Sequence, residues 1–205
     1  MSTPWDDFLK KSVERVFANS KLVIDIGGGL RAVERRGNRY DPSRAWIKPL
    51  IDKVDYKILD PVPDYHPDII GDIHALPLED DSVDAYCCLA VLEHVKNPFT
   101  AVNQMQRTLK KGGLCLIYAP FIYRYHPLPG YFEDYWRYTE DGLKELFKGF
   151  SRIEIQNVRG RGETVFHLTP FTRIKTFMRL IVWMDKLFHF NVTKQTAGFY
   201  LLAEK

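Results

Sequence analysis

The amino-acid sequence predicts an α/β protein with a doubly wound, mainly parallel, Rossmann-like sheet of about seven strands. The last strand is expected to be antiparallel and to follow a helical insertion. Three observations favour this class. Short apolar runs alternate with amphipathic segments along the 205 residues, as in sheets whose strands are joined by helices. The first run passes directly into three glycines at 27–29, and several runs end on an aspartate.

The overall composition is that of one ordinary globular domain. Hydrophobic residues make up 45% of the chain and charged residues 27%, which excludes wholesale disorder. A length of 205 residues predicts a single domain with additions rather than two full domains. The formal net charge of +3 is too small to indicate a nucleic-acid partner by itself.

The first half of the chain predicts one long helix, one short helix and four strands. An amphipathic helix is expected at 5–17, because Trp5, Phe8, Val13 and Phe17 fall on one side of it. A short helix at 46–53 leads to the second strand. The four strands are predicted at 22–26, at the run ending on 60, at 68–70 and at 84–89.

The second half predicts three helices and three strands. A helix at 98–109 is expected to stop at Lys111, Gly112 and Gly113, which resemble a glycine C-cap. Thr139 is the predicted N-cap of the next helix, and a longer helix is expected at about 170–188. The remaining strands are predicted at 114–119, 151–158 and 196–203.

The cysteines and the apolar segments limit where the chain works. The chain has three cysteines, an odd number that does not suit a set of disulfides, and all of them lie in apolar runs: Cys87, Cys88 and Cys115. We therefore expect buried thiols of a reducing, cytoplasmic compartment. The first eleven residues contain no apolar signal-peptide core. Charged residues interrupt the apolar stretch at 177–190, which argues against a membrane span. No Cys or His spacing predicts a metal site.

Three aspartates and a glycine-rich turn follow neighbouring strands. Ligands of open α/β sheets bind outside the carboxyl ends of the strands, where Asp25, the glycines at 27–29, Asp60 and Asp72 are expected to meet. Glycines let backbone approach a ligand closely. An acid after the second strand can accept hydrogen bonds from ribose hydroxyls, and one after the third from an exocyclic amine. The pattern favours a cofactor that contains a nucleoside.

A nicotinamide dinucleotide is the alternative cofactor. Residues 27–32 match the looser fingerprint G-x-G-x-x-A. In that motif the ribose-binding acid lies about 20 residues further on, whereas Asp60 lies 31 residues after Gly29. A carboxylate at Asp25, just before the glycines, also suits a cationic ligand better than a pyrophosphate.

Five motifs in order resemble the class I S-adenosylmethionine (SAM)-dependent methyltransferases of the type 11 kind. They are Val23-Ile24-Asp25-Ile26-Gly27-Gly28-Gly29, Ile58-Leu59-Asp60, Gly71-Asp72-Ile73-His74-Ala75-Leu76-Pro77 with Ser82-Val83-Asp84, Val91-Leu92-Glu93-His94-Val95 with Asn97-Pro98, and Leu109-Lys110-Lys111-Gly112-Gly113. The resemblance covers about 22–150. It departs from the family at Arg31, where a third glycine is usual, and in the long stretch between Asp25 and Asp60.

The resemblance implies SAM as cofactor and a methyltransferase (EC 2.1.1.-) as activity. The implied cofactor-binding residues are Asp25, Gly27, Gly28 and Gly29 for the methionine part, Asp60 for the ribose, Asp72 and Ile73 for adenine, and Leu89, Ala90 and Val91 for the sulfonium side. We expect one domain over 1–205. Its parts would be an N-terminal helix (1–20), a cofactor-binding core (21–165), a helical insertion or lid (166–195) and the last strand (196–205).

A narrower block at 126–143 resembles a subgroup that we associate with glycan biosynthesis, so the expected acceptor is a small molecule such as a sugar or glycan intermediate. Its aromatic-rich surroundings at 121–138 suit stacking on a sugar ring. His126 is the candidate general base. Tyr123, Asp134, Tyr135 and Arg137 are candidate acceptor contacts, with a purely structural role as the alternative for the last three.

Two other functions stay open from the sequence. One is a catalytically silent binding module, favoured by Arg31 and by the lack of a clear catalytic group. The other is a nucleic-acid methyltransferase that uses the basic residues of 31–48, although such a partner is unlikely without a stronger basic patch. The helix at 171–188 could be a lid, a homodimer surface or a weak contact with a membrane surface.

Overall fold

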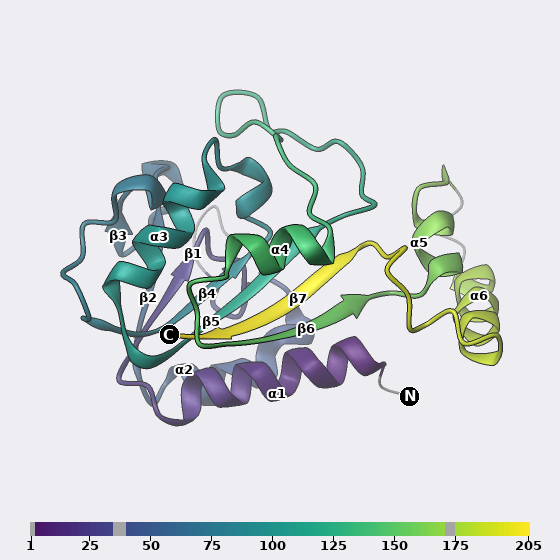
Figure 1. Ribbon diagram of the computed structural model, residues 1–205, viewed down its shortest axis with the longest axis horizontal. Coiled ribbons are helices and arrows are strands. Elements are labelled where there is room, and N and C mark those ends of the chain that lie inside the picture. The colour runs from purple at the N-terminus through teal and green to yellow at the C-terminus, as the bar shows by residue number, and fades with distance from the viewer. Residues whose placement is uncertain (1–2, 35–39, 171–174) are drawn as a thin grey trace.

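The computed structural model describes residues 3–34, 40–170 and 175–205 (Figure 1). The strands are β1 Leu22–Ile26, β2 Asp55–Asp60, β3 Ile69–Ile70, β4 Val83–Leu89, β5 Leu109–Pro120, β6 Arg152–Val158 and β7 Gly198–Glu204. The α-helices are α1 Pro4–Ala18, α2 Lys48–Ile51, α3 Pro98–Thr108, α4 Glu140–Leu146, α5 Arg161–His167 and α6 Lys175–Leu187. Short 3-10 helices are η1 Pro42–Ile47, η2 Pro63–Tyr65, η3 Ile73–Ala75 and η4 Leu92–His94.

The described strands form one seven-stranded sheet in the order β3-β2-β1-β4-β5-β7-β6. Strands β1 to β5 pair in parallel, and β7 is antiparallel to both β5 and β6. β6 therefore runs in the same direction as β5, and β7 is inserted between them. The predicted fold class is confirmed, including the antiparallel last strand. The strand order reverses between β1 and β4, where ligand sites of such sheets are found.

Both faces of the sheet are covered, which explains why its central strands are apolar throughout. In β1, Val23 packs into the core that α1 covers, whereas Ile24 and Ile26 pack into the core beneath α3 and α4. Figure 1 shows α1 on one side of the sheet and α3 and α4 on the other. Side chains alternate between the faces along a strand, so a continuous apolar run serves both cores.

Side-chain caps fix where two of the helices begin. Thr3 and Asp6 form a capping box at α1, with Thr3 Oγ1 accepting from the Asp6 N–H at 3.2 Å and Asp6 Oδ2 accepting from the Thr3 N–H at 3.3 Å. Thr139 caps α4, because its Oγ1 accepts from the Gly142 N–H at 3.0 Å. The predicted N-cap is confirmed.

The predicted glycine cap after α3 is wrong. The helix ends at Thr108, because Leu109 already has extended backbone angles and begins β5. Gly112, at φ +73°, lies within the β5 segment, where its N–H donates to the Lys205 carbonyl at 2.9 Å. The β4–β5 register shifts here, from Val83 opposite Leu109 to Ala85 opposite Leu114. Gly112 therefore permits an irregularity in the strand and does not end a helix.

Two predicted helices differ in extent. The segment predicted at 46–53 divides into η1, which starts at Pro42, and the single-turn α2. The segment predicted at 170–188 corresponds to α6, with 171–174 outside the described residues. α5 was not predicted, because glycines at 160 and 162 weaken the helical pattern of 161–167. α5 and α6 pack on each other beyond the end of the sheet (Figure 1).

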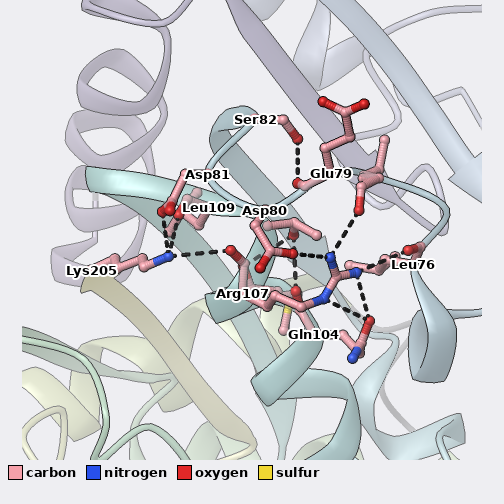
Figure 2. Close-up of polar contacts among 12 residues, drawn as sticks. Leu76, Glu79, Asp80, Asp81, Ser82, Gln104, Arg107, Leu109 and Lys205 are labelled. Carbon is pink, nitrogen blue, oxygen red and sulfur yellow. Dashed lines mark hydrogen bonds and ion pairs between the residues drawn. The ribbon is translucent and has the colours of Figure 1, made fainter.

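Arg107 of α3 fastens the chain that leaves β3 (Figure 2). Its guanidinium donates to the carbonyls of Leu76 and Leu78 at 3.1 and 3.0 Å and pairs with Asp80 at 2.5 Å. Gln104 Oε1 accepts from the same guanidinium at 2.9 Å. A planar group with five donors can satisfy several carbonyls at once. Arg107 therefore holds the 76–80 connection against α3.

Candidate functional site

A cavity of about 940 Å³ opens at the carboxyl ends of β1, β2 and β4. Its walls come from four strand ends and from the loop between β5 and α4. Lining residues that the sequence singled out are Gly27, Gly28, Gly29, Asp60, Asp72, Ile73, Leu89, Ala90, Val91, His126 and Tyr135. The three-dimensional structure thus brings most of the predicted cofactor residues and two predicted acceptor residues around one space. Asp25, Tyr123, Asp134 and Arg137 are not among the lining residues.

The glycine loop lies close against the end of β4. Gly27 has φ +72°, and a Cβ on it would lie 2.7 Å from Cγ2 of Val91. A Cβ on Gly29 would meet the carbonyl oxygen of Leu89. Both positions therefore exclude any side chain, and the loop backbone itself forms the cavity wall.

Arg31 occupies the position at which the resemblance led us to expect a third glycine. It has φ +53°, in the left-handed region that glycine adopts without penalty. Its N–H donates to the Gly28 carbonyl at 3.2 Å, and its exposed side chain lines the cavity. The backbone at Arg31 therefore has a conformation that glycine adopts readily.

Asp25 lies beneath the glycine loop and is fully buried. Its Oδ2 accepts from the Leu30 N–H at 3.1 Å and from the Tyr56 hydroxyl at 2.5 Å. Its Oδ1 has no hydrogen-bond partner among the described residues. Burial raises the pKa of Asp25 to about 7, against the lowering effect of these hydrogen bonds. Its contacts are those of a brace for the loop, whereas the expectation was a contact with the methionine part of the cofactor.

Asp60 ends β2 and lines the cavity with only 7% of its surface exposed. Its Oδ1 accepts from the Val62 N–H at 2.8 Å, which fixes the side chain. Burial raises the pKa of Asp60, and the Val62 hydrogen bond opposes that increase. An anchored, partly desolvated carboxylate can accept two hydrogen bonds from a diol.

Asp72 follows β3 and belongs to a small network. Its Oδ1 accepts from the His74 N–H at 2.9 Å and lies 2.7 Å from His74 Nδ1. His74 Nε2 accepts from the Asn97 N–H at 3.2 Å, at the start of α3. These bonds fix the His74 tautomer with its proton on Nδ1. Asp72 and the neighbouring Ile73, which is 6% exposed, reach the cavity side by side.

The end of β4 forms the wall opposite Asp60. Leu89 is buried, and Ala90 has φ +57°, a left-handed conformation unusual for a residue with a Cβ. The Ala90 N–H donates to the Tyr118 carbonyl at 3.0 Å, which holds this turn. The strained turn directs 89–91 into the cavity beside the glycine loop.

Asp134 and Arg137 form an ion pair that organises the β5–α4 loop. Both carboxylate oxygens of Asp134 accept from the guanidinium, at 2.5 and 2.7 Å, and Oδ2 also accepts from the His126 N–H at 2.8 Å. Arg137 further donates to the Arg124 carbonyl at 2.7 Å. The hydrogen bonds from Arg137 hold the pKa of Asp134 at about 2. These contacts give Asp134 and Arg137 a structural role in the loop.

The other predicted acceptor residues divide into two groups. Tyr123 packs edge-on against His126, with ring centroids 5.2 Å apart, and contacts His167. His126 and Tyr135 lie at the cavity itself. His126 Nδ1 lies 2.9 Å from the Arg124 carbonyl oxygen, so the ring donates there and leaves Nε2 as its acceptor nitrogen.

Glu93 and His94 were not among the expected site residues, although the sequence places a possible acid and base together there. Glu93 is 1% exposed, and its Oε1 lies 3.9 Å from His94 Nε2 and 3.8 Å from His126 Nε2. Burial raises the pKa of Glu93 to about 8, with Asp134 adding to the increase. Burial also lowers the pKa of His94. The available signal was their position directly after β4, in the motif Val91-Leu92-Glu93-His94-Val95.

Features outside the cavity bear on the remaining expectations. Cys87, Cys88 and Cys115 are free and fully buried, as predicted. In the basic stretch, Lys48 pairs with Asp52 at 3.0 Å, whereas 35–39 lie outside the described residues. Among the described helices, none is long and apolar enough to cross a membrane.

α6 exposes large apolar side chains, and its role as a lid, a dimer surface or a membrane contact stays a prediction. The exposed residues of α6 and the segment after it are Phe177, Leu180, Trp183, Met184, Leu187, Phe188, Phe190 and Val192.

Comparison with known proteins agrees with this geometry. Residues 41–117 match the family model for a methyltransferase domain. A curated relative, the uncharacterized 37.1 kDa protein in transposon TN4556 of Streptomyces fradiae, is 43% identical over 51 residues. That match covers 25% of this chain and 15% of the relative.

Solved structures match nearly the whole chain. A SAM dependent methyltransferase from Archaeoglobus fulgidus has a TM-score of 0.59 at 14% identity, over 97% of this chain and 94% of that one. A Mesorhizobium loti S-adenosylmethionine dependent methyltransferase scores 0.58 at 12% identity, over 98% and 97%. Haemonchus contortus phosphoethanolamine N-methyltransferase 2, in complex with S-adenosyl-L-methionine, scores 0.55 at 16% identity, over 98% of this chain and 52% of that one.

Proposed function

The chain has the class I SAM-dependent methyltransferase fold and a methyltransferase-domain match, and from this premise we propose that it binds SAM and methylates a small molecule. The single observation that carries the proposal is the cavity at the switch in strand order. The glycine loop, Asp60, Asp72 and the 89–91 turn all line it. A nucleoside cofactor needs these groups together, and they come from separate strands.

Each wall of the cavity suits one part of the cofactor. The carboxylate of Asp60 would accept the two ribose hydroxyls, and Asp72 with Ile73 would hold adenine. The backbone of 27–29 would lie along the methionine part, with Asp25 supporting it from below through Leu30. When bound, SAM supplies an electrophilic methyl group, so the protein must mainly align the acceptor with it.

The acceptor side of the cavity favours a sugar or another polyhydroxylated ring. Tyr65 and Tyr131 both line the cavity, and their rings stack with centroids 5.5 Å apart. Tyr135 adds a third, half-exposed ring. Aromatic faces beside histidine nitrogens suit a ligand with apolar ring faces and hydroxyl edges.

Titration calorimetry with S-adenosylhomocysteine and with NAD tests the cofactor. We expect the homocysteine nucleoside to bind wild type. Asp60→Ala should weaken this binding by at least about 10–100-fold, because each hydrogen bond to a charged group is worth ~1.5–3 kcal/mol. Asp55→Ala is the matched control, since Asp55 lies on the same strand with its side chain 59% exposed. Binding of NAD alone would contradict the proposal.

Two other functions would give different results. A silent binding module would bind SAM without turning over any sugar, phenol or amine acceptor. A nucleic-acid methyltransferase would bind polynucleotides with an affinity that falls steeply as salt increases. Product detection after incubation with SAM and a panel of sugars, sugar phosphates and oligonucleotides separates the three functions. A cytoplasmic location and a homodimer stay predictions.

A further inference from the structure

Two histidines and a buried glutamate converge on one point of the cavity wall. Glu93 and His94 come from η4 after β4, and His126 comes from the loop after β5. One ligand atom from each lies within 4.8 Å of the others. His94 and His126 line the cavity, and Glu93 lies behind them. The three residues will be called the histidine–glutamate cluster.

The unused nitrogen of each ring faces the glutamate. His94 Nδ1 lies 2.6 Å from the Glu133 carbonyl oxygen, and His126 Nδ1 lies 2.9 Å from the Arg124 carbonyl oxygen. Each ring therefore donates its Nδ1 proton to backbone and turns an Nε2 lone pair toward Glu93 Oε1, at 3.9 and 3.8 Å. Metal-binding histidines have this arrangement, in which a backbone carbonyl fixes the tautomer of the ring.

One carboxyl oxygen of the glutamate lacks a hydrogen-bond partner among the described residues. Glu93 Oε2 is buried and accepts no hydrogen bond from any described residue. The backbone carbonyl of Glu93, in contrast, accepts from the Tyr135 and Trp136 N–H groups at 2.7 and 3.2 Å, so the backbone that carries this side chain is held in place. Leaving a buried carboxyl oxygen unpaired costs free energy, and a bound cation would remove that cost.

We propose that the histidine–glutamate cluster binds one divalent transition-metal ion such as Zn²⁺. Two imidazoles and one carboxylate are a ligand set found in catalytic zinc sites and in non-haem iron sites. Hard ions such as Mg²⁺ prefer oxygen ligands, so the two nitrogens favour a transition metal. Small side-chain rotations would shorten the observed separations to those that ligand bonds of ~2.0–2.2 Å require.

The ion would leave open positions toward the cavity, and this part of the inference rests on the proposed methyl transfer. A hydroxyl of the acceptor could bind there, which favours an oxygen acceptor over an amine. Bound to the ion, the hydroxyl would lose its proton to solvent water more readily. Its oxygen would then form a bond to the methyl carbon as the carbon–sulfur bond breaks, with that electron pair staying on sulfur. His126 would be a ligand in this arrangement, not the predicted general base.

Calorimetry with Zn²⁺ on untagged, chelator-treated full-length protein tests the site, with Co²⁺ absorption as a second readout. We expect one ion per chain. Glu93→Gln and His126→Ala should each lower the affinity by more than the ~10–100-fold typical of outer-shell partners. His66→Ala, at an exposed histidine, is the control and should bind as wild type does. The three cysteines are fully buried and do not offer a competing surface site.

Circular dichroism establishes whether each variant is folded. If His126→Ala does not fold, the near-isosteric Glu93→Gln still tests the site. Affinity for Zn²⁺ that is unchanged in both variants, or lost equally in His66→Ala, would overturn the metal site. S-adenosylhomocysteine binding is measured on the same samples. Zn²⁺ bound through the cluster without nucleoside binding would support the site and refute the proposed function.

Discussion

At the scale of single residues, Asp25 shows how a buried motif residue can brace the glycine loop from beneath. Its carboxylate joins the Leu30 N–H above to the Tyr56 hydroxyl on the neighbouring strand. Its other oxygen is buried and accepts no hydrogen bond from the part of the chain that the structure describes. Ionising such a group is costly, because its side chain is fully buried. The glycine loop thus rests on a carboxyl group that favours its neutral form.

This environment predicts a pH-dependent stability. The pKa of Asp25 rises from 3.8 to about 7 on folding, so the folded state holds a proton that the unfolded state loses between these values. The unfolding free energy must therefore fall as pH rises through this range. Asp25→Asn cannot ionise. Relative to that variant, wild type should lose ~2–4 kcal/mol between about pH 4 and pH 7.5, at ~1.4 kcal/mol per pKa unit.

Urea unfolding of wild type and Asp25→Asn at matched pH values measures this difference. Asp84→Asn is the control for removing an aspartate near β1, because hydrogen bonds from Lys110 and from the Leu22 and Lys21 N–H groups lower the pKa of Asp84 despite partial burial. Parallel pH profiles for wild type and Asp25→Asn would contradict the prediction.

At the scale of elements, the site depends on connections that lie outside it. The 76–80 connection follows Asp72 and Ile73, which line the cavity. The guanidinium of Arg107 holds this connection (Figure 2). Arg107 lies on α3, the helix that follows β4. The position of Asp72 is therefore coupled to the packing of α3 in two ways. One is the set of Arg107 hydrogen bonds to the 76–80 connection, called the Arg107 clamp below, and the other is the His74–Asn97 hydrogen bond.

Removing the clamp should destabilise the protein and weaken the cofactor site together. Arg107→Ala leaves the Leu76 and Leu78 carbonyls without their donor, and hydrogen bonds to charged groups are worth ~1.5–3 kcal/mol. We expect a loss of ~2–3 kcal/mol of unfolding free energy and weaker S-adenosylhomocysteine binding. Arg107→Lys keeps the charge but cannot span both carbonyls, so it should recover less than half of the loss.

Chemical unfolding and calorimetry on the same samples check both effects. Lys48→Ala serves as a comparison, because its ion pair with Asp52 is exposed on both sides and exposed pairs contribute ~0–1 kcal/mol. An Arg107→Ala protein as stable as Lys48→Ala would show that the clamp carries little energy.

At the scale of the whole molecule, α5 and α6 form an addition joined to the end of the sheet. Asp185 of α6 is 3% exposed and accepts from the Gly162 and Glu163 N–H groups of α5 at 2.9 and 2.8 Å. A Cβ on Gly162 would lie 2.7 Å from the carboxylate. Gly160 and Gly162 weakened the helical pattern in the sequence. In the structure they make room for the Asp185 carboxylate, which accepts hydrogen bonds at the start of α5.

Asp185→Ala should separate this helical pair locally. The variant leaves two N–H groups of α5 unpaired, and each unsatisfied group costs ~1–3 kcal/mol. Limited proteolysis should then cleave 161–195 at least several times faster, while S-adenosylhomocysteine affinity stays near that of wild type, because none of these residues lines the cofactor cavity. Asp185→Asn keeps one acceptor oxygen, so its cleavage rate should lie between those of wild type and Asp185→Ala.

A control on the opposite side of α6 makes the result specific. Trp183 is 59% exposed, so Trp183→Ala should leave the cleavage rate of 161–195 unchanged. Equal cleavage of wild type and Asp185→Ala would show that other contacts hold the pair.

The sequence determined that seven strands exist, their order along the chain and the residues at the carboxyl ends of β1 and β2. β1 was predicted with its exact bounds, and Asp60 and the glycines were recognised as cavity residues, because both signals are local. A buried strand needs a continuous apolar run, and a left-handed turn without room for a Cβ needs glycine. The Thr139 cap is local in the same sense, since its partner lies three residues away.

Only the tertiary structure decided which way the strand-end side chains face and what meets between them. The Asp25 side chain lies beneath the glycine loop, and Asp134 forms an ion pair with Arg137. Glu93 and His126, 33 positions apart in the sequence, became neighbours. No periodicity records such encounters, because they depend on how β4 and β5 pair and on how the following loop folds back. Pairing partners distant in sequence are fixed by packing of the whole sheet, and the histidine–glutamate cluster exists only once that packing is complete.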